Sequence, residues 1–217
     1  MPRSCSACIF DLDGTLLDTL PDLVVLTNIA LEQCGFPPRT SEEILSYVGN
    51  GHRSLMQQAV PDGADQSSLD HAISLWENLT PEYGSRMTKP YPGIEELLSE
   101  LRSHNIKLAV LSNKFHEGTT HLIEHFFPDL FEVVYGVCDE IPRKPEPKGL
   151  LKVVAELGVL PHESWYIGDS LSDNVTAEAA GSHGVCVTWG YHSRAVLETA
   201  PGALVIDEPR ELLKYVL

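Results

Sequence analysis

Residues 6–15 of the chain read SACIFDLDGT, and this stretch carries the strongest single indication of the fold. Its first part, Ser6 to Phe10, is a short apolar run with the length of a buried strand. Two carboxylates, Asp11 and Asp13, follow at the end of the strand, where ligands bind in open α/β sheets. Because alternate residues of a strand share a side, both can face one ligand, and a hard cation such as Mg²⁺ would relieve their repulsion. A solvated turn after the strand is the alternative.

From residue 91 onward, strands and helices alternate along the chain. The apolar runs at 106–112, 131–137, 164–168 and 184–189 have strand character, and helical patterns lie between them. Such alternation predicts an α/β fold, with a Rossmann-like parallel sheet and helices on both of its faces.

The segment that follows the first strand has a different character. Helical spacing recurs at 20–34, 52–60 and 67–83, a capping pattern begins at Thr40 or Ser41, and no run of strands appears between 19 and 85. We therefore expect an α/β core domain made of residues 1–16 and 87–217, and an inserted all-α cap domain at 17–86. Because ligands often bind at domain junctions, a cleft over Asp11 is expected there.

Composition limits the kinds of partner that the protein can bind and indicates the compartment in which it is expected. The 217 residues carry a formal net charge of −16, which argues against nucleic acid as a partner. No apolar run approaches the length of a membrane span, and the start of the chain leaves no room for a signal peptide. The five scattered cysteines are typical of reduced cytosolic thiols. We expect a cytoplasmic protein, a monomer or homodimer, that makes no contact with membranes.

Polar side chains follow two further strands. Ser112 and Asn113 come at the end of the strand at 106–112, where a hydroxyl and an amide suit phosphate oxygens, although both residue types also cap helices. Asp169 and Asp173 follow the strand at 164–168, and carboxylates at this spacing in a strand-to-helix turn can converge on a cation. Alternatively, Asp173 is an acid favoured in the first turn of a helix, and it can play both roles.

A basic loop, Arg143 to Lys148, lies between the predicted strands at 131–137 and 164–168. Lys144 offers a compact ammonium that can offset the negative charge of a carboxylate and of a phosphate, and the neighbouring prolines would stiffen the loop. Lys148 is a rival candidate, and a solvated basic turn is the alternative to both.

These four motifs, in this order, resemble those of the haloacid dehalogenase superfamily. The stretch at 11–15 resembles the first motif, D-x-D-G-T, and this implies that Asp11 is a nucleophile that becomes phosphorylated and that Asp13 is a general acid/base. Dehalogenase members have a non-acidic residue at the second position, so Asp13 points to phosphoryl transfer. Ser112 matches the second motif, which hydrogen-bonds the phosphoryl group, and Lys144 resembles the lysine of the third. The insertion occupies the place of the helical cap of the first type.

The resemblance also implies a Mg²⁺ cofactor and a set of ligands. The stretch at 168–173 resembles the fourth motif, G-D-x-x-x-D, so Asp11, the backbone carbonyl of Asp13 and Asp169 are the expected metal ligands. Asp173 would ligate the ion or hold its water shell. The substrate is expected to be a small phosphorylated metabolite, in contact with Gly14, Thr15 and Asn113.

The cap segment suggests which relatives are most similar. It contains no lysine, unlike phosphonatase relatives, and residues 17–23 lack the histidine of phosphosugar mutases. The residues at 17–23 and 47–51 are similar to the corresponding stretches of phosphoglycolate phosphatase relatives. Arg53, just after a glycine turn, is our candidate for binding a substrate carboxylate. A surface arginine is the alternative at that position.

A pyrophosphatase or a nucleotide or sugar phosphatase remains a second possibility for the function, and a mutase or a non-catalytic binding module is a third.

Overall fold

The computed structural model describes residues 5–200 and 202–217. It divides into two compact units, a core unit of Met1–Leu17 and Pro90–Leu217 and a helical unit of Asp18–Lys89. The chain passes between them twice, at β2 (Leu17–Asp18) and β3 (Lys89–Pro90), which form a two-stranded sheet. The sequence analysis did not anticipate these two short strands. No helix in the described part of the chain is both long and apolar enough to cross a membrane.

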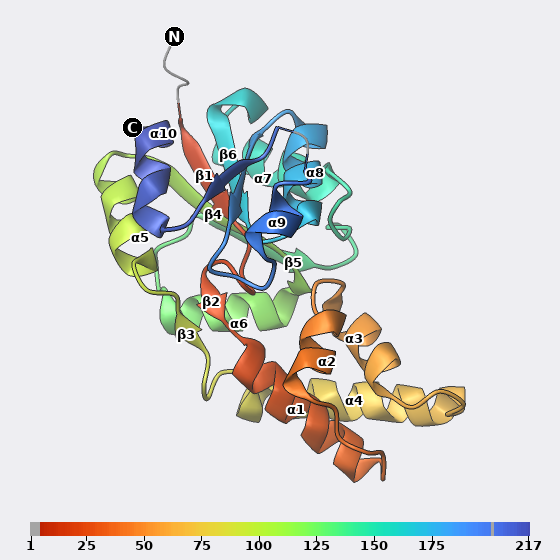
Figure 1. Cartoon of the computed structure of the whole chain (residues 1–217). Coiled ribbons are helices and arrows are strands. Elements are labelled where there is room, and N and C mark those ends of the chain that lie inside the picture. Colours follow the sequence, from red (N-terminus) through yellow and green to blue (C-terminus); the bar gives the residue numbers. More distant parts are fainter. Residues whose placement is uncertain (1–4, 201) are drawn as a thin grey trace. The chain divides into compact units, whose positions relative to one another are not determined.

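The core unit is built on a six-stranded parallel sheet with the strand order β5-β4-β1-β6-β7-β8 (Figure 1). Its strands are β1 (Ala7–Phe10), β4 (Lys107–Phe115), β5 (Val133–Val137), β6 (Ser164–Gly168), β7 (His183–Val187) and β8 (Leu204–Ile206). The predicted α/β class with a Rossmann-like sheet is therefore confirmed. The main difference in the strands is that β4 runs to Phe115, three residues beyond its expected end.

Helices cover both faces of this sheet (Figure 1). One apolar cluster joins Cys8 and Phe10 to α5 (Ile94–Ser103), α6 (His116–Phe126) and the C-terminal α10 (Leu213–Val216). The other joins Ala7 and Ile9 to α7 (Lys148–Leu157) and α8 (Leu171–Ala180). Successive residues of β1 thus serve opposite faces, as strand geometry requires. Short elements complete the unit: η1 (Pro161–Glu163), α9 (Arg194–Leu197) and η2 (Pro209–Leu212).

The order of the strands determines where ligands can bind. From β1 the chain moves to β4 and β5 on one side, and then returns to β6 on the other side of β1. This reversal is a topological switch point, and the crevice outside the carboxyl ends of the strands there is the usual ligand site of such sheets. Asp11 lies at this point, and its backbone N–H donates to the carbonyl of Ile167 in β6.

The helical unit contains α1 (Leu20–Gln33), α2 (Ser41–Tyr47), α3 (Gly51–Ala59) and α4 (Gln66–Tyr83). Thr40 begins α2 with the expected capping box, in which its hydroxyl accepts from the Glu43 N–H and the Glu43 carboxylate accepts from the Thr40 N–H. Buried Trp76 on α4 donates its indole N–H to the hydroxyl of Thr27 on α1. The unit therefore has its own apolar interior and its own hydrogen bonds between helices and at a helix end.

Candidate active site

The side chains that the sequence motifs singled out in the core unit come from the carboxyl ends of three adjacent strands and one loop. Asp11 follows β1, Ser112 lies near the end of β4, and Asp169 follows β6. Lys144 lies in the loop between β5 and α7. Because β1 lies between β4 and β6, parallel pairing brings these positions to the same edge of the sheet.

Three carboxylates form the centre of this edge. Oxygen atoms of Asp11, Asp169 and Asp173 all lie within 4.8 Å of one another, and all three residues are buried. Burial raises the pKa of Asp11 to about 7; Lys144 opposes this shift, while Asp173 and Asp169 add to it. Burial also raises the pKa of Asp169.

The buried cation Lys144 contacts two carboxylates of this cluster. Its Nζ lies 3.0 Å from Asp11 Oδ2 and 2.6 Å from Asp173 Oδ1, and the residue is only 5% exposed. Burial alone would lower the pKa of Lys144, but the charges of Asp11 and Asp173 outweigh that effect and hold it well above its usual range. Nζ also lies 5.5 Å from the centre of the Tyr166 ring. Lys148, the rival candidate, is the exposed first residue of α7.

The negative charge of the site is not fully compensated by Lys144, and a divalent cation would balance it. With the three carboxylates ionised and Lys144 protonated, the cluster has a net charge of 1 − 3 = −2. Uncompensated charge in a buried place is costly, and oxygen atoms of carboxylates are the ligands that hard cations prefer. The donor set therefore fits a metal ion of the magnesium class.

Two glycines make space for these carboxylates. Gly14 has a φ of +83°, and a Cβ atom there would collide with the Asp169 carboxylate. A Cβ atom at Gly168, the last residue of β6, would collide with the side chain of Asp173. The glycines of the first and fourth motifs are thus needed for close approach as well as for the turn.

Asp169 and Asp173 are held by further hydrogen bonds. Asp169 Oδ2 accepts from the backbone N–H of Tyr191 at 2.6 Å. Asp173 Oδ2 accepts from the backbone N–H and the hydroxyl of Ser170, which caps α8, while its Oδ1 accepts from Lys144. Asp173 therefore lies in the first turn of α8, where it completes the capping box, and also belongs to the acidic cluster, the two roles considered for it from sequence.

The end of β4 supplies two more polar side chains. Ser112 is buried, and its hydroxyl accepts from the backbone N–H of Lys114 at 3.2 Å. The Asn113 amide oxygen accepts from the Lys144 N–H at 2.7 Å, and its NH₂ group donates to the Lys144 carbonyl at 3.4 Å. Asn113 thus holds the backbone of Lys144, a task that its sequence position did not indicate. Its predicted contact with substrate stays a prediction.

Sequence reasoning missed Lys114. Its Nζ lies 3.2 Å from Asp13 Oδ1 and 3.4 Å from Asp13 Oδ2. The only available signal was its position directly after Ser112 and Asn113. The predicted strand ends at 112, so the sequence pattern assigns Lys114 to a loop and gives no direction for its side chain.

Two other predicted contact residues have different surroundings. Thr15 is fully buried, and its hydroxyl has no hydrogen-bond partner among the described residues, while its carbonyl accepts from the indole of Trp189. Arg53 lies on α3 of the helical unit with its side chain 60% exposed, and its guanidinium contacts Glu77 at 2.9 Å. Substrate contacts of Thr15 and Arg53 stay predictions.

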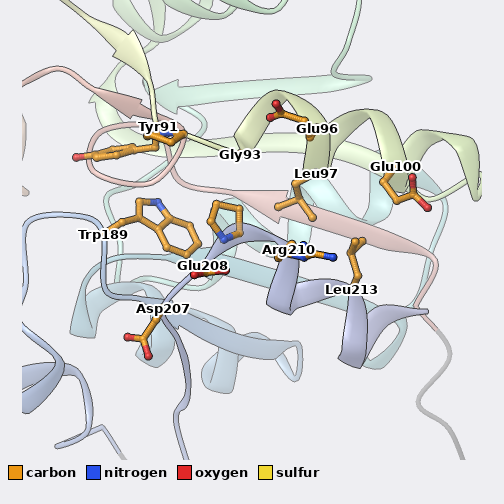
Figure 2. Close-up of a pocket in the computed structure, with 12 residues that line it drawn as sticks. Tyr91, Gly93, Glu96, Leu97, Glu100, Trp189, Asp207, Glu208, Arg210 and Leu213 are labelled. Carbon is orange, nitrogen blue, oxygen red and sulfur yellow. The ribbon is translucent and has the colours of Figure 1, made fainter.

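A groove of about 840 Å³ also opens on the core unit, between α5 and the C-terminal segment (Figure 2). Tyr91, Leu97, Trp189 and Leu213 form much of its lining, together with several acidic side chains. Its lining, within the described residues, includes neither the acidic cluster nor Lys144. The groove is therefore separate from the candidate active site.

Comparison with known proteins identifies the family. The family model described as haloacid dehalogenase-like hydrolase matches residues 8–187. A phosphoglycolate phosphatase of Pseudomonas putida is 34% identical over 94% of this chain and 77% of its own length. One of Nitrosospira multiformis is 36% identical over 94% of this chain and 92% of its own.

The fold agrees with this assignment. A crystal structure from Lactobacillus delbrueckii subsp. bulgaricus superposes with a TM-score of 0.90 at 30% identity, covering 100% of this chain and 99% of the other. The family match extends from β1 to the end of β7 and so includes every motif of the acidic edge. This chain belongs to the haloacid dehalogenase-like hydrolases.

Proposed function

We propose that this phosphatase hydrolyses small phosphate monoesters in a Mg²⁺-dependent reaction that passes through a phosphorylated Asp11. The observation that carries the proposal is the convergence of Asp11, Lys144 and two further buried carboxylates at the switch point of the sheet. This arrangement combines a nucleophile, a cation for the phosphoryl oxygens and a set of ligands for a metal ion.

Each residue of the core site has a task in this scheme. Asp11 attacks phosphorus as the ester oxygen leaves, and Asp13 gives its proton to that oxygen. Asp13 then takes a proton from the water molecule that hydrolyses the aspartyl-phosphate. Ser112 and Lys144 bind the phosphoryl oxygens, and Asn113 keeps the backbone of Lys144 in place.

Asp11, Asp169 and Asp173 are the side chains that would hold Mg²⁺, with the backbone carbonyl of Asp13 as a further ligand. When bound, the ion would offset the negative charge that gathers on the phosphoryl oxygens. The net charge of the cluster and the space left by Gly14 support this assignment.

For the substrate we propose 2-phosphoglycolate. The curated relatives at 34% and 36% identity bear the name phosphoglycolate phosphatase, and they match nearly the whole chain. Pyrophosphate, nucleotides and sugar phosphates are the alternatives on the same core, because fold and nucleophile do not separate these substrates.

Phosphate release from a panel of phosphorylated compounds tests both levels of the proposal. The panel contains 2-phosphoglycolate, pyrophosphate, a nucleoside monophosphate, a hexose phosphate and p-nitrophenyl phosphate, ranked by kcat/KM with Mg²⁺ and with excess chelator. We expect release that requires Mg²⁺ and the highest kcat/KM for 2-phosphoglycolate. A different first-ranked substrate would overturn the substrate assignment alone, whereas no Mg²⁺-dependent release from any ester would overturn the catalytic proposal.

A further inference from the structure

We propose that Lys114 binds the carboxylate of the substrate and so distinguishes 2-phosphoglycolate from simple alkyl phosphates. This inference rests on the proposed function. It assigns a specificity role to a residue that lies outside the sequence motifs and within the core unit.

The position of Lys114 is unusual for a lysine. Its side chain is only 9% exposed, and its Nζ contacts both carboxylate oxygens of Asp13, at 3.2 and 3.4 Å. Lysine is rarely this enclosed unless it is paired, because burying an ammonium ion is costly. The Asp13 side chain is 16% exposed, so the pair retains some access to solvent on its Asp13 side.

An irregularity in β4 brings Lys114 to this place. Leu111 pairs with Tyr135 of β5, but the next pairing is Phe115 with Val137, so four steps along β4 correspond to two along β5. Such bulges re-aim side chains and are common beside active sites. The stretch inside the bulge carries Ser112, Asn113 and Lys114, whose side chains reach the Lys114 N–H, the Lys144 backbone and Asp13 respectively.

The chemistry of the substrate explains why a cation is needed at this position. As general acid, Asp13 must lie within hydrogen-bond distance of the ester oxygen that leaves. In 2-phosphoglycolate a single methylene group separates that oxygen from the carboxyl carbon. A group that binds the carboxylate must therefore lie next to Asp13, and Lys114 Nζ does.

Lys114 can serve both groups at once. An ammonium ion has three donors, so it can keep its contact with Asp13 and still donate to a second carboxylate. Lys144 is less suited to this task, since its Nζ already contacts Asp11 and Asp173.

The test compares two substrates that differ in the carboxylate. kcat/KM is measured for 2-phosphoglycolate and for ethyl phosphate in the wild type, Lys114→Met, Lys114→Arg, Arg53→Ala and Lys152→Met. Lys152 is the matched control, because it is a lysine of the core unit that pairs with exposed Glu140 at 2.6 Å. The ratio of the two kcat/KM values is the readout, since an effect of the substitution on Asp13 slows both substrates, whereas loss of a carboxylate contact slows only 2-phosphoglycolate.

We expect Lys114→Met to lower this ratio roughly 10- to 100-fold, the usual effect of losing a charge-assisted hydrogen bond. Lys114→Arg should retain part of the preference, and Lys152→Met should leave it unchanged. If Lys114→Met shows no cooperative thermal unfolding, Lys114→Gln takes its place in the same comparison, because it keeps polar character without the charge.

Several results would overturn the inference. Equal losses on both substrates would mean that Lys114 acts only through Asp13. A fall in the ratio for Arg53→Ala, with none for the Lys114 variants, would transfer the role to Arg53. A wild type that hydrolyses both esters without preference would also refute the role of Lys114, while leaving the phosphatase proposal intact. A wild type that hydrolyses neither of these two esters, nor any compound of the panel described above, would refute the proposed function itself.

Discussion

The ammonium nitrogen of Lys144 lies 3.0 Å from a carboxylate oxygen of Asp11, although the two residues are far apart in the sequence. The contact is buried and shared with Asp173, whose oxygen lies 2.6 Å from the same nitrogen. A buried cation between two carboxylates stabilises them only while all partners are present. Removing the Lys144 charge should therefore cost stability, and a change at any of the three residues should affect the chemistry of the site.

Replacing the proposed nucleophile should separate activity from folding. We expect Asp11→Asn to lower kcat by at least about 10⁴-fold on every ester, because an amide does not form the phosphorylated intermediate. The melting temperature should change little, since Asn has a similar shape and Lys144 keeps its contact with Asp173. Phosphate release and calorimetry measure the two effects, with Asp70→Asn, an exposed position on α4, as control. Near wild-type turnover in Asp11→Asn would contradict the assignment.

Removing the charge of Lys144 should affect stability as well as activity. Lys144→Met leaves Asp11 and Asp173 buried without their cation, so we expect a loss of about 3–5 kcal/mol in the free energy of unfolding, together with a large fall in kcat. Urea unfolding without metal gives the first quantity and phosphate release the second. Lys148→Met is the matched control, because Lys148 is close to Lys144 in the sequence but its side chain is exposed. A larger effect of Lys148→Met would show that the wrong lysine has been chosen.

Mg²⁺ should stabilise the folded protein before any substrate is added. An ion that binds only the folded state at about 100 times its Kd adds about 2.7 kcal/mol to the free energy of unfolding. The melting temperature should therefore rise with Mg²⁺ and fall again with a chelator. Asp169→Asn should abolish this rise, because Asp169 belongs to the acidic cluster. The same rise in Asp169→Asn as in the wild type would place the ion elsewhere.

A buried carboxylate of α1 joins the two ends of the helical unit's chain by hydrogen bonds, and its loss should lower the stability of the unit. Asp22, 2% exposed on α1, accepts hydrogen bonds from the N–H of Met87 and from the N–H and hydroxyl of Thr88. Asp22→Asn replaces one acceptor by an NH₂ group that faces donors, so we expect a loss of about 1–3 kcal/mol.

Urea unfolding followed by circular dichroism measures this loss, with the exposed Asp62→Asn as control. An unchanged midpoint for Asp22→Asn, equal to that of Asp62→Asn, would show that these hydrogen bonds contribute little.

Much of the fold was predictable because the signals are local. Apolar runs placed five strands of the sheet, and the Thr40–Glu43 pattern marked the start of α2. The α/β class follows from the alternation of strands and helices, and the structure confirms it. The short pair β2 and β3 was missed, since two-residue strands carry no periodicity.

The candidate site was predictable only in part. Asp11, Asp169 and Asp173 could be named because carboxylates at strand ends mark the edge where ligands bind. The choice between Lys144 and Lys148 depended on a resemblance, whereas the structure buries one and exposes the other. Lys114 was not named at all, because the bulge in β4 cannot be inferred from a single strand.

The sequence by itself determined which residues lie at the ends of strands, since burial patterns and turn residues act over a few neighbouring positions. Only the tertiary structure decided which side chains meet. Lys144 reaches Asp11 and Asp173, and Lys114 reaches Asp13, through the order of parallel strands and a shift in their register. The physical reason is that a contact between charges depends on positions in space, which pairing between distant strands establishes.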